Sequence, residues 1–192
     1  MIIGLIGKKG SGKTTASKRF VDHYDFKLVP FKDQLIKEMK KNFPDTIREL
    51  TRAYNLSVDE LFIQKPPIMR ALLQNYGTEV RRGDSTDYWI SKWEETVRTY
   101  HEFEDVVVDD VRFINEAQTI KSLGGVLVYI ALEGQELTDK HVSETEMDQI
   151  PFEYMITASK GDIGGIYKQI DLIYEDAKIF ENRATSSKGF TQ

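Results

Sequence analysis

The sequence MIIGLIGKKGSGKTTASKRF, residues 1–20, decides how the rest of the chain is interpreted. It starts with an apolar, β-branched stretch at 1–6 that predicts a strand, and its last part predicts a helix over 12–24. Between them, GKKGSGKT at 7–14 matches G-x-x-x-x-G-K-T, the pattern of a phosphate-binding loop, in the strand-to-helix context that such a loop requires. This stretch therefore predicts a site for the phosphates of a nucleoside triphosphate.

Each part of this loop has a physical role. Its glycines let successive backbone N–H groups turn toward one anion, and the start of the following helix adds its positive end. The Lys13 ammonium can reach the β- and γ-phosphates, and the Thr14 hydroxyl can bind Mg²⁺. We therefore expect ATP and Mg²⁺ to be bound by Gly7, Lys8, Lys9, Gly10, Ser11, Gly12, Lys13, Thr14 and Thr15.

The composition excludes several other classes of protein. With 192 residues, 26 basic and 31 acidic, the chain carries a net charge of −5, which disfavours a grip on duplex nucleic acid. The absence of cysteine excludes disulfides, cysteine-bound metals and a thiol nucleophile. The longest apolar run, 126–132, is far shorter than the roughly 20 residues that cross a bilayer, and no secretory signal is recognisable. We expect a cytoplasmic protein with no membrane partner.

Strand and helix patterns alternate along the chain. Apolar runs predict four more strands, at 26–31, 105–109, 126–132 and 154–157. Periodic patterns predict further helices at 33–42, 67–76, 87–100, 115–123 and 162–180. This alternation predicts an α/β fold, a three-layer, doubly wound, parallel five-stranded sheet, and the loop at 7–14 makes it one of the P-loop NTPase type.

The predicted domain contains an insertion. About 70 residues separate the second and third predicted strands, far more than one crossover needs, and most of them look helical. We expect a single domain at 1–181 with a helical lobe inserted at about 44–93. The end of the chain, 182–192, lacks periodicity and is expected to be disordered.

Polar residues follow the third predicted strand, where ligands of open α/β sheets bind. Asp109 and Asp110 end this strand, and a carboxylate there is the usual second support for Mg²⁺, although twin aspartates also suit a turn or a helix cap. Arg112 comes two residues later, at the same edge of the sheet.

The predicted lobe is rich in groups that recognise nucleotides. Arg70 and Gln74 lie four apart on one flank of a helix, a guanidinium for a phosphate and an amide for a base edge. A kinase whose acceptor is a phosphate must hold two polyanions together and needs no strong general base. The cations that meet this need are Lys8, Lys9, Lys13, Arg70, Arg81, Arg82 and Arg112.

Several motifs occur together in one order. They are FKD at 31–33 with Lys37, LQNYGTE at 73–79, YW at 88–89, DVRF at 110–113 with NE at 115–116, and HVSE at 141–144. With these motifs the chain resembles the bacteriophage deoxynucleoside monophosphate kinases, P-loop enzymes of the adenylate-kinase type, over most of its length.

The resemblance implies transfer of the ATP γ-phosphate to a deoxynucleoside monophosphate, a step of dNTP biosynthesis in the cytoplasm of an infected host cell. It implies catalytic roles for Lys13, Asp110 and Arg112, and Mg²⁺ held by Thr14 and Asp110. It places around the acceptor nucleotide Lys37, Arg70, Gln74, Glu79, Arg81, Arg82, Trp89, Arg112 and Glu116. It also suggests a lid at 133–147, but that segment is acidic rather than arginine-rich. A homodimer stays open.

Three alternatives remain at this stage. The acceptor could be another small phosphorylated molecule, as in the phosphomevalonate kinases, which need no base-reading amide. A GTPase switch is disfavoured because a D-x-x-G motif is missing after the third predicted strand. A non-catalytic ATP-binding regulatory protein would have no use for the acceptor arginines.

Overall fold

The computed structural model describes residues 1–134 and 146–188, and the side chains of these residues except at 82, 84 and 180–188. The chain forms two compact units. We call Met1–Pro30 with Thr96–Gln192 the sheet unit, and Phe31–Glu95 the helical unit. Each unit is described by itself below.

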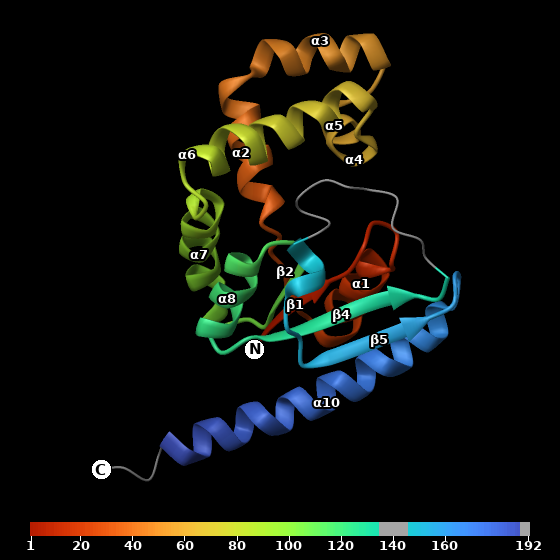
Figure 1. The fold of residues 1–192 in the computed structure, drawn as a ribbon, viewed down its shortest axis with the longest axis vertical. Helices are drawn as coiled ribbons and strands as arrows, with labels where there is room; N and C mark the ends of the chain where they lie inside the picture. Colours follow the sequence, from red (N-terminus) through yellow and green to blue (C-terminus); the bar gives the residue numbers. More distant parts are fainter. Residues whose placement is uncertain (135–145, 189–192) are drawn as a thin grey trace. The chain divides into compact units, whose positions relative to one another are not determined.

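The sheet unit is built on five parallel strands (Figure 1). They are β1 (Ile2–Ile6), β2 (Lys27–Leu28), β3 (Val106–Val111), β4 (Val126–Leu132) and β5 (Tyr154–Ala158), in the order β2-β3-β1-β4-β5. This is the predicted doubly wound sheet, so the fold class is confirmed. The second strand is much shorter than the expected 26–31, and Pro30, which has no N–H to give to a neighbouring strand, follows closely.

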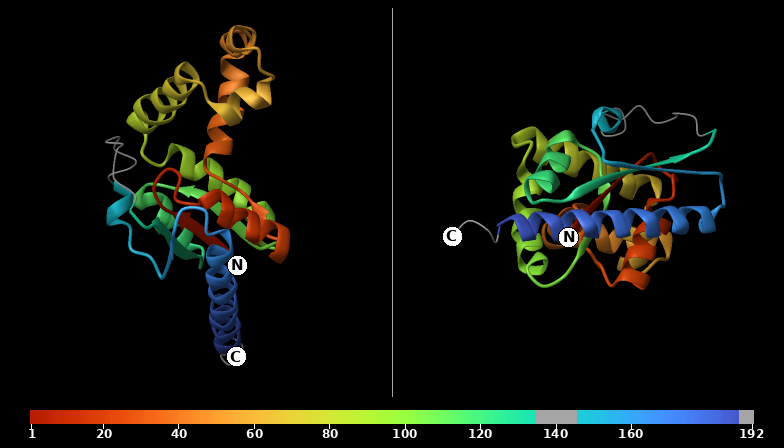
Figure 2. Two further views of the ribbon diagram at one scale, coloured as in Figure 1. Left: turned by 90° about the vertical axis from the view of Figure 1, so that its right-hand side faces the viewer. Right: turned by 90° about the horizontal axis from the view of Figure 1, so that it is seen from below.

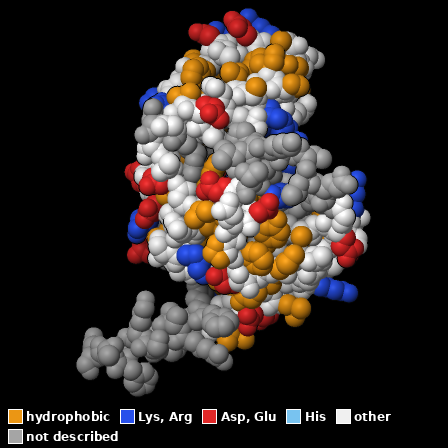
Figure 3. Space-filling view, viewed as in Figure 1, with side chains coloured by type: hydrophobic (Ala, Val, Ile, Leu, Met, Phe, Trp, Pro, Cys, Tyr) orange, Lys and Arg blue, Asp and Glu red, His pale blue; other side chains and the backbone are white. Residues whose placement is uncertain are grey.

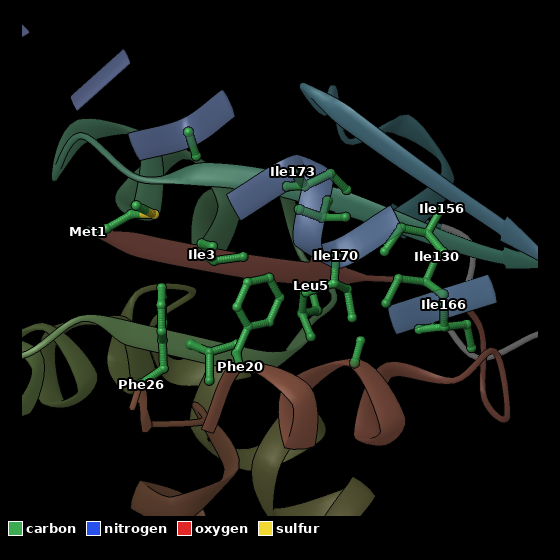
Figure 4. Close-up of a cluster of buried hydrophobic side chains, with 14 of the residues drawn as sticks. Met1, Ile3, Leu5, Phe20, Phe26, Ile130, Ile156, Ile166, Ile170 and Ile173 are labelled. Atoms are coloured by element: carbon green, nitrogen blue, oxygen red, sulfur yellow. The ribbon is translucent and has the colours of Figure 1, made fainter. Parts of the chain in front are cut away.

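Helices cover both faces of the sheet. On one face, α1 (Lys13–Tyr24) and α10 (Ile163–Lys188) pack on a core that contains Ile3, Leu5 and Ile130 (Figure 4). On the other face lies α8 (Ile114–Ser122), which can approach closely because β1 carries Gly4: a Cβ there would come within 2.8 Å of Ile120 and of Leu127. The result is the expected three-layer arrangement.

The last helix is longer than expected. Figure 2 shows α10 from below, lying over the strands of the sheet unit. It continues to Lys188, so the expected disorder of the tail is corrected for 182–188. The residues at 182–188 include neither proline nor glycine, so nothing in them stops a helix once it has formed. Residues 189–192 lie outside the described part.

The β5 edge of the sheet is closed at one point by a side chain. Gln169 of α10 accepts a hydrogen bond from the Thr157 N–H (3.2 Å) and donates one to the Thr157 carbonyl (2.9 Å). Beside this edge, hydrophobic side chains are exposed over β4 and β5 (Figure 3). They include Met155, which is 52% exposed, and Phe152, whose ring lies 5.3 Å from that of Tyr129. At the β5 edge, the backbone groups of Thr157 are therefore already hydrogen-bonded, and exposed apolar side chains lie beside them.

The helical unit has its own core. Its elements are α2 (Lys32–Asn42), α3 (Pro44–Tyr54), α4 (Val58–Gln64), α5 (Pro67–Gln74), the π-helix η1 (Asn75–Val80), α6 (Arg81–Asp84) and the first part of α7 (Tyr88–His101). Buried residues from several of these helices, among them Met39, Leu61, Met69 and Trp89, form one cluster. Because α2 contributes to it, the unit is larger than the expected insertion at 44–93. No helix in the described part of the chain has the length and apolar character needed to cross a membrane.

One turn of this unit departs from the sequence expectation. The helix predicted over 67–76 ends at Gln74, and the chain continues as the π-helix η1. The turn of a π-helix is wider than that of an α-helix, so a side chain of another helix can pack against it. Gly77 lies there, and a Cβ on it would come within 2.9 Å of Leu35 Cδ2 of α2. The Trp89 indole N–H donates to the Gly77 carbonyl at 2.8 Å. Long-range contacts therefore stabilise a turn that the local pattern cannot predict.

Candidate active site

The predicted phosphate-binding loop connects β1 to α1. Gly10 and Gly12 have φ angles of 80° and 101°, in the left-handed region that favours glycine. At Gly7, a Cβ would run into the Ile130 carbonyl oxygen and, at 2.6 Å, into Ser11 Oγ. The turn is closed by a hydrogen bond from the Ser11 N–H to the Lys8 carbonyl (3.0 Å). The strand-loop-helix arrangement expected from the sequence is present.

Two polar groups in this loop fit an anionic ligand. The Lys13 ammonium donates to the carbonyl of Gly7 and, at 2.9 Å, to that of Lys8, so it lies over the loop itself. The Ser11 hydroxyl is fully buried and has no hydrogen-bond partner among the described residues. Burying a hydroxyl in this way costs free energy unless a ligand satisfies it. The donor set of the loop therefore suits phosphate oxygens.

A β-bulge places two carboxylates beside the loop. Gly4 pairs with Val108 and Ile6 pairs with Val111, so Asp109 and Asp110 together oppose a single residue of β1. A bulge re-aims the side chains that it carries and is frequent next to active sites. Asp109 is only 8% exposed and Asp110 is half-buried. The sequence located these aspartates but gave no sign of the bulge.

The residues present suit Mg²⁺ bound together with phosphate. No three His, Cys, Asp or Glu side chains within 1–134 and 146–188 converge into a metal-binding group. Mg²⁺ at a phosphate site needs no such group, because one or two carboxylates, a hydroxyl and the phosphate oxygens supply its ligands. The Thr14 hydroxyl, at the start of α1, and the carboxylate of Asp110 offer that chemistry.

Glu116 has a structural role at the start of α8. It is 5% exposed, and its Oε2 accepts hydrogen bonds from the backbone N–H groups of Arg112 (2.9 Å) and Phe113 (3.2 Å). These bonds cap the first turn of α8, and the expected contact between Glu116 and an acceptor nucleotide stays a prediction. They also hold the backbone of Arg112, whose side chain is half-buried just beyond β3.

A short 3₁₀-helix, η2 (Glu146–Gln149), contacts the loop from the other side. Met147 Sδ accepts from the Gly7 N–H at 3.3 Å, and Asp148 Oδ2 lies 2.6 Å from Lys8 Nζ. The lid expected at 133–147 falls mostly on 135–145, outside the described residues. Its last two residues, 146 and 147, belong to η2. No pattern in the sequence pointed to this contact.

The helical unit contains a cluster of polar side chains around Glu38. The hydroxyls of Tyr76 and Tyr88 each donate to its carboxylate at 2.6 Å, and the Arg81 guanidinium lies 2.7 Å from it. The same guanidinium lies 5.0 Å from the centroid of each tyrosine ring. Glu38, which is 12% exposed, links α2 to η1, α6 and α7.

This environment shifts the pKa of two groups. Burial alone would raise the pKa of the Glu38 carboxyl, but the hydrogen bonds from Tyr76 and Tyr88 and the charge of Arg81 outweigh it and hold the pKa below 4.5. Burial, together with the bond to Glu38, raises the pKa of Tyr88 to about 12. The tyrosine therefore stays a proton donor and the glutamate an acceptor at neutral pH.

The other residues predicted to bind the acceptor fall into two groups. Trp89 is buried in the core of the helical unit, where its N–H donates to the Gly77 carbonyl, and its expected contact with substrate stays a prediction. Arg81 is engaged by Glu38 and Tyr76. The exposed residues are Lys37 on α2, Arg70 and Gln74 on α5, and Glu79 on η1. The side chain of Arg82 lies outside the description.

Comparisons with known proteins identify the family to which the chain is similar. Residues 53–170 match the family described as deoxynucleotide monophosphate kinase. A protein of Acanthamoeba polyphaga mimivirus, whose name assigns it provisionally to these kinases, is 33% identical over 184 residues, covering 88% of this chain and 94% of that protein. The deoxynucleotide monophosphate kinase of Escherichia phage RB69 is 28% identical over 108 residues, or 55% of this chain and 44% of the phage protein.

A solved structure, the shikimate kinase of Aquifex aeolicus, aligns with a TM-score of 0.45 and 14% identity, over 93% of this chain and 99% of that chain. The fold stated above rests on the strand order and the register of this chain.

Proposed function

The chain belongs to the deoxynucleotide monophosphate kinase family, and from this membership we propose that it transfers the γ-phosphate of ATP to a deoxynucleoside monophosphate. The products are ADP and a deoxynucleoside diphosphate. As a member of this family the protein is a nucleotide kinase, a phosphotransferase. The choice of ATP as donor and the identity of the acceptor are our proposal.

The loop at 7–14 carries the donor half of this proposal. Its glycine-dependent turn, its buried Ser11 hydroxyl and the Lys13 ammonium form an anion site at the start of a helix. Thr14 and Asp110 would hold Mg²⁺, which when bound neutralises charge between the β- and γ-phosphates. Lys13 stabilises the charge that develops on the transferred group.

The helical unit carries the acceptor half. An acceptor phosphate is already anionic, so its oxygen attacks without a strong general base and needs cations to hold it. Lys37 and Arg70 are exposed cations on this unit, and Gln74 is an amide that can read a base edge. We propose that this unit, within a single kinase domain at 1–181, binds the deoxynucleoside monophosphate. Arg112, on the sheet unit, is a further cation that would bind a phosphate group.

A coupled assay of ADP release tests this function directly. The protein is supplied with ATP, Mg²⁺ and each deoxy- and ribonucleoside monophosphate in turn, with mevalonate 5-phosphate as a control acceptor. We expect ADP release with at least one deoxynucleoside monophosphate and background release with mevalonate 5-phosphate. Release without any acceptor would identify a hydrolase, and no release with the whole panel would refute the proposal.

A further inference from the structure

Three consecutive residues of η2 each hold a different part of the sheet unit's site. Glu146 Oε1 accepts from the Ile114 N–H at 3.0 Å, at the start of α8. Met147 Sδ accepts from the Gly7 N–H at 3.3 Å, and Asp148 Oδ2 accepts from Lys8 Nζ at 2.6 Å. This short helix therefore joins the loop that follows β1 to the segment that follows β3.

The η2 helix is firmly anchored. Met147 is fully buried, and its carbonyl accepts from the N–H of Ile150, which is 3% exposed. The other carboxylate oxygen of Asp148 lies 3.4 Å from the Tyr129 hydroxyl of β4. Contacts made by η2 can therefore fix the position of the loop, since the helix itself is held by the core and by a strand.

Lys8 connects η2 to Ser11 and Lys13, the two loop residues proposed to contact phosphate. Its ammonium is held by Asp148, and its side chain is only 14% exposed. Its carbonyl accepts two hydrogen bonds, from the Ser11 N–H at 3.0 Å and from the Lys13 ammonium at 2.9 Å. The position of the Lys8 peptide thus determines where Ser11 and Lys13 lie.

We propose that Asp148 is a positioning residue for the donor phosphates, acting through Lys8 on Ser11 and Lys13, with Met147 holding the first peptide of the same loop. This inference rests on the proposed function, because it takes the loop as the site of ATP. It assigns η2 a role in the architecture of the donor site.

The two ways in which Asp148 could act on the loop, by positioning Lys8 or by its negative charge alone, predict opposite changes in ATP affinity. If Asp148 acted only as a negative charge near the phosphates, its removal would make ATP bind more tightly. If it positions Lys8, its removal lets the loop relax and makes ATP bind less tightly. Asp148→Asn, which keeps the size and removes the charge, separates the two cases.

The first experiment uses calorimetry to measure how tightly the protein binds a non-hydrolysable ATP analogue, the β,γ-methylene compound, in the presence of Mg²⁺. The quantity compared between variants is the Kd of the protein for this analogue. We expect Asp148→Asn to raise this Kd about fivefold, the upper range for a partly exposed ion pair. The KM for ATP should rise similarly while the KM for the acceptor stays unchanged. Met147→Leu, which keeps the volume but loses the sulfur acceptor, should shift the Kd in the same direction.

A double-mutant cycle tests the route through Lys8. In a Lys8→Met background, Asp148→Asn should change the analogue Kd less than about twofold, because the group through which it acts is gone. The matched control is Asp22→Asn, which removes an ion pair of 2.7 Å with Lys18 on the surface of α1 and should leave the Kd unchanged. Thermal unfolding of every variant checks that it is folded.

The outcomes are separable. Unchanged or tighter analogue binding by Asp148→Asn overturns the inference, as does an undiminished effect in the Lys8→Met background. If the unmodified protein itself neither binds the analogue nor releases ADP, the proposed function fails instead.

Discussion

At the scale of single residues, Lys13 is the side chain proposed to stabilise the charge that develops on the transferred phosphate. Its ammonium lies over the carbonyls of the loop, at the position where the donor phosphates are proposed to bind. We expect Lys13→Ala to lower kcat by about 10²–10³, the loss that follows from removing one preorganised charge-stabilising donor. The rate of ADP release measures it. Lys18→Ala, which changes an exposed lysine later in the same helix, is the matched control, and a normal kcat in Lys13→Ala would refute the role.

Gln74 is expected to affect specificity more than rate. Its amide is exposed at the end of α5, four residues after Arg70, where it can accept and donate hydrogen bonds along a base edge. We expect Gln74→Ala to change the ranking of kcat/KM among the bases more than the rate for the preferred one. The panel of monophosphates measures this ranking. Gln64→Ala, at an exposed glutamine of α4, should preserve it; an unchanged ranking in Gln74→Ala would remove the base-reading role.

At the scale of secondary-structure elements, the Glu38 cluster connects four helices through one carboxylate. Its pKa is held below the ordinary 4.5. The unfolded chain therefore takes up a proton at a higher pH than the folded protein does. It follows that the free energy of unfolding falls as the pH is lowered from about 5 toward 3. The stabilisation is present at neutral pH and is lost in acid.

Variants of this cluster test that dependence. We expect Glu38→Gln to lower the stability at pH 7 and to flatten the acid part of the profile, because the titrating group is gone. Tyr88→Phe removes one of the hydrogen bonds that lower the pKa, so it should flatten the profile in part. Urea unfolding at intervals of about one pH unit, between pH 3 and 7, measures the free energy of unfolding of each variant. A wild-type slope in Glu38→Gln would contradict the assignment.

Elements that are encoded locally could be predicted, and those that depend on distant partners could not. The loop at 7–14 was predicted because its glycines, lysine and helix start all lie within one short stretch. The π-helix η1 was missed because its widened turn depends on Leu35 and Trp89. The bulge at Asp109 and Asp110 was missed for the same reason, since it exists only in the register with β1.

The candidate site shows the same limit. The sequence identified the cations and carboxylates by type, but it could not tell which were already used within the fold. The Glu116 carboxylate accepts from the backbone N–H groups of Arg112 and Phe113, just before α8, and the Trp89 indole N–H donates to the Gly77 carbonyl. Glu38 carried no motif, and η2 shares only residues 146 and 147 with the segment interpreted as a lid, so neither contact was foreseen.

At the scale of the whole molecule, each of the two units has buried hydrophobic residues of its own in the described part of the chain. Ile130 is fully buried in the sheet unit and Met69 is fully buried in the helical unit. We expect Met69→Ala and Ile130→Ala each to cost about 2–5 kcal/mol, the range for truncating a buried side chain. Hydrogen exchange should then rise first at 31–95 for Met69→Ala and first in the sheet unit for Ile130→Ala. Equal acceleration of both units by each variant would show that they unfold as one.

The hydrogen bonds of Gln169 have a consequence for the behaviour of the protein at high concentration. An open strand edge of five residues, such as that of β5 with exposed Met155 in it and exposed Phe152 just before it, is a template with which a strand from another copy could pair. The amide of Gln169 occupies both backbone groups of Thr157, the fourth of these five residues, and so interrupts that template. The Gln169 side chain of α10 therefore opposes the pairing of β5 edges into continuous, amyloid-like sheets.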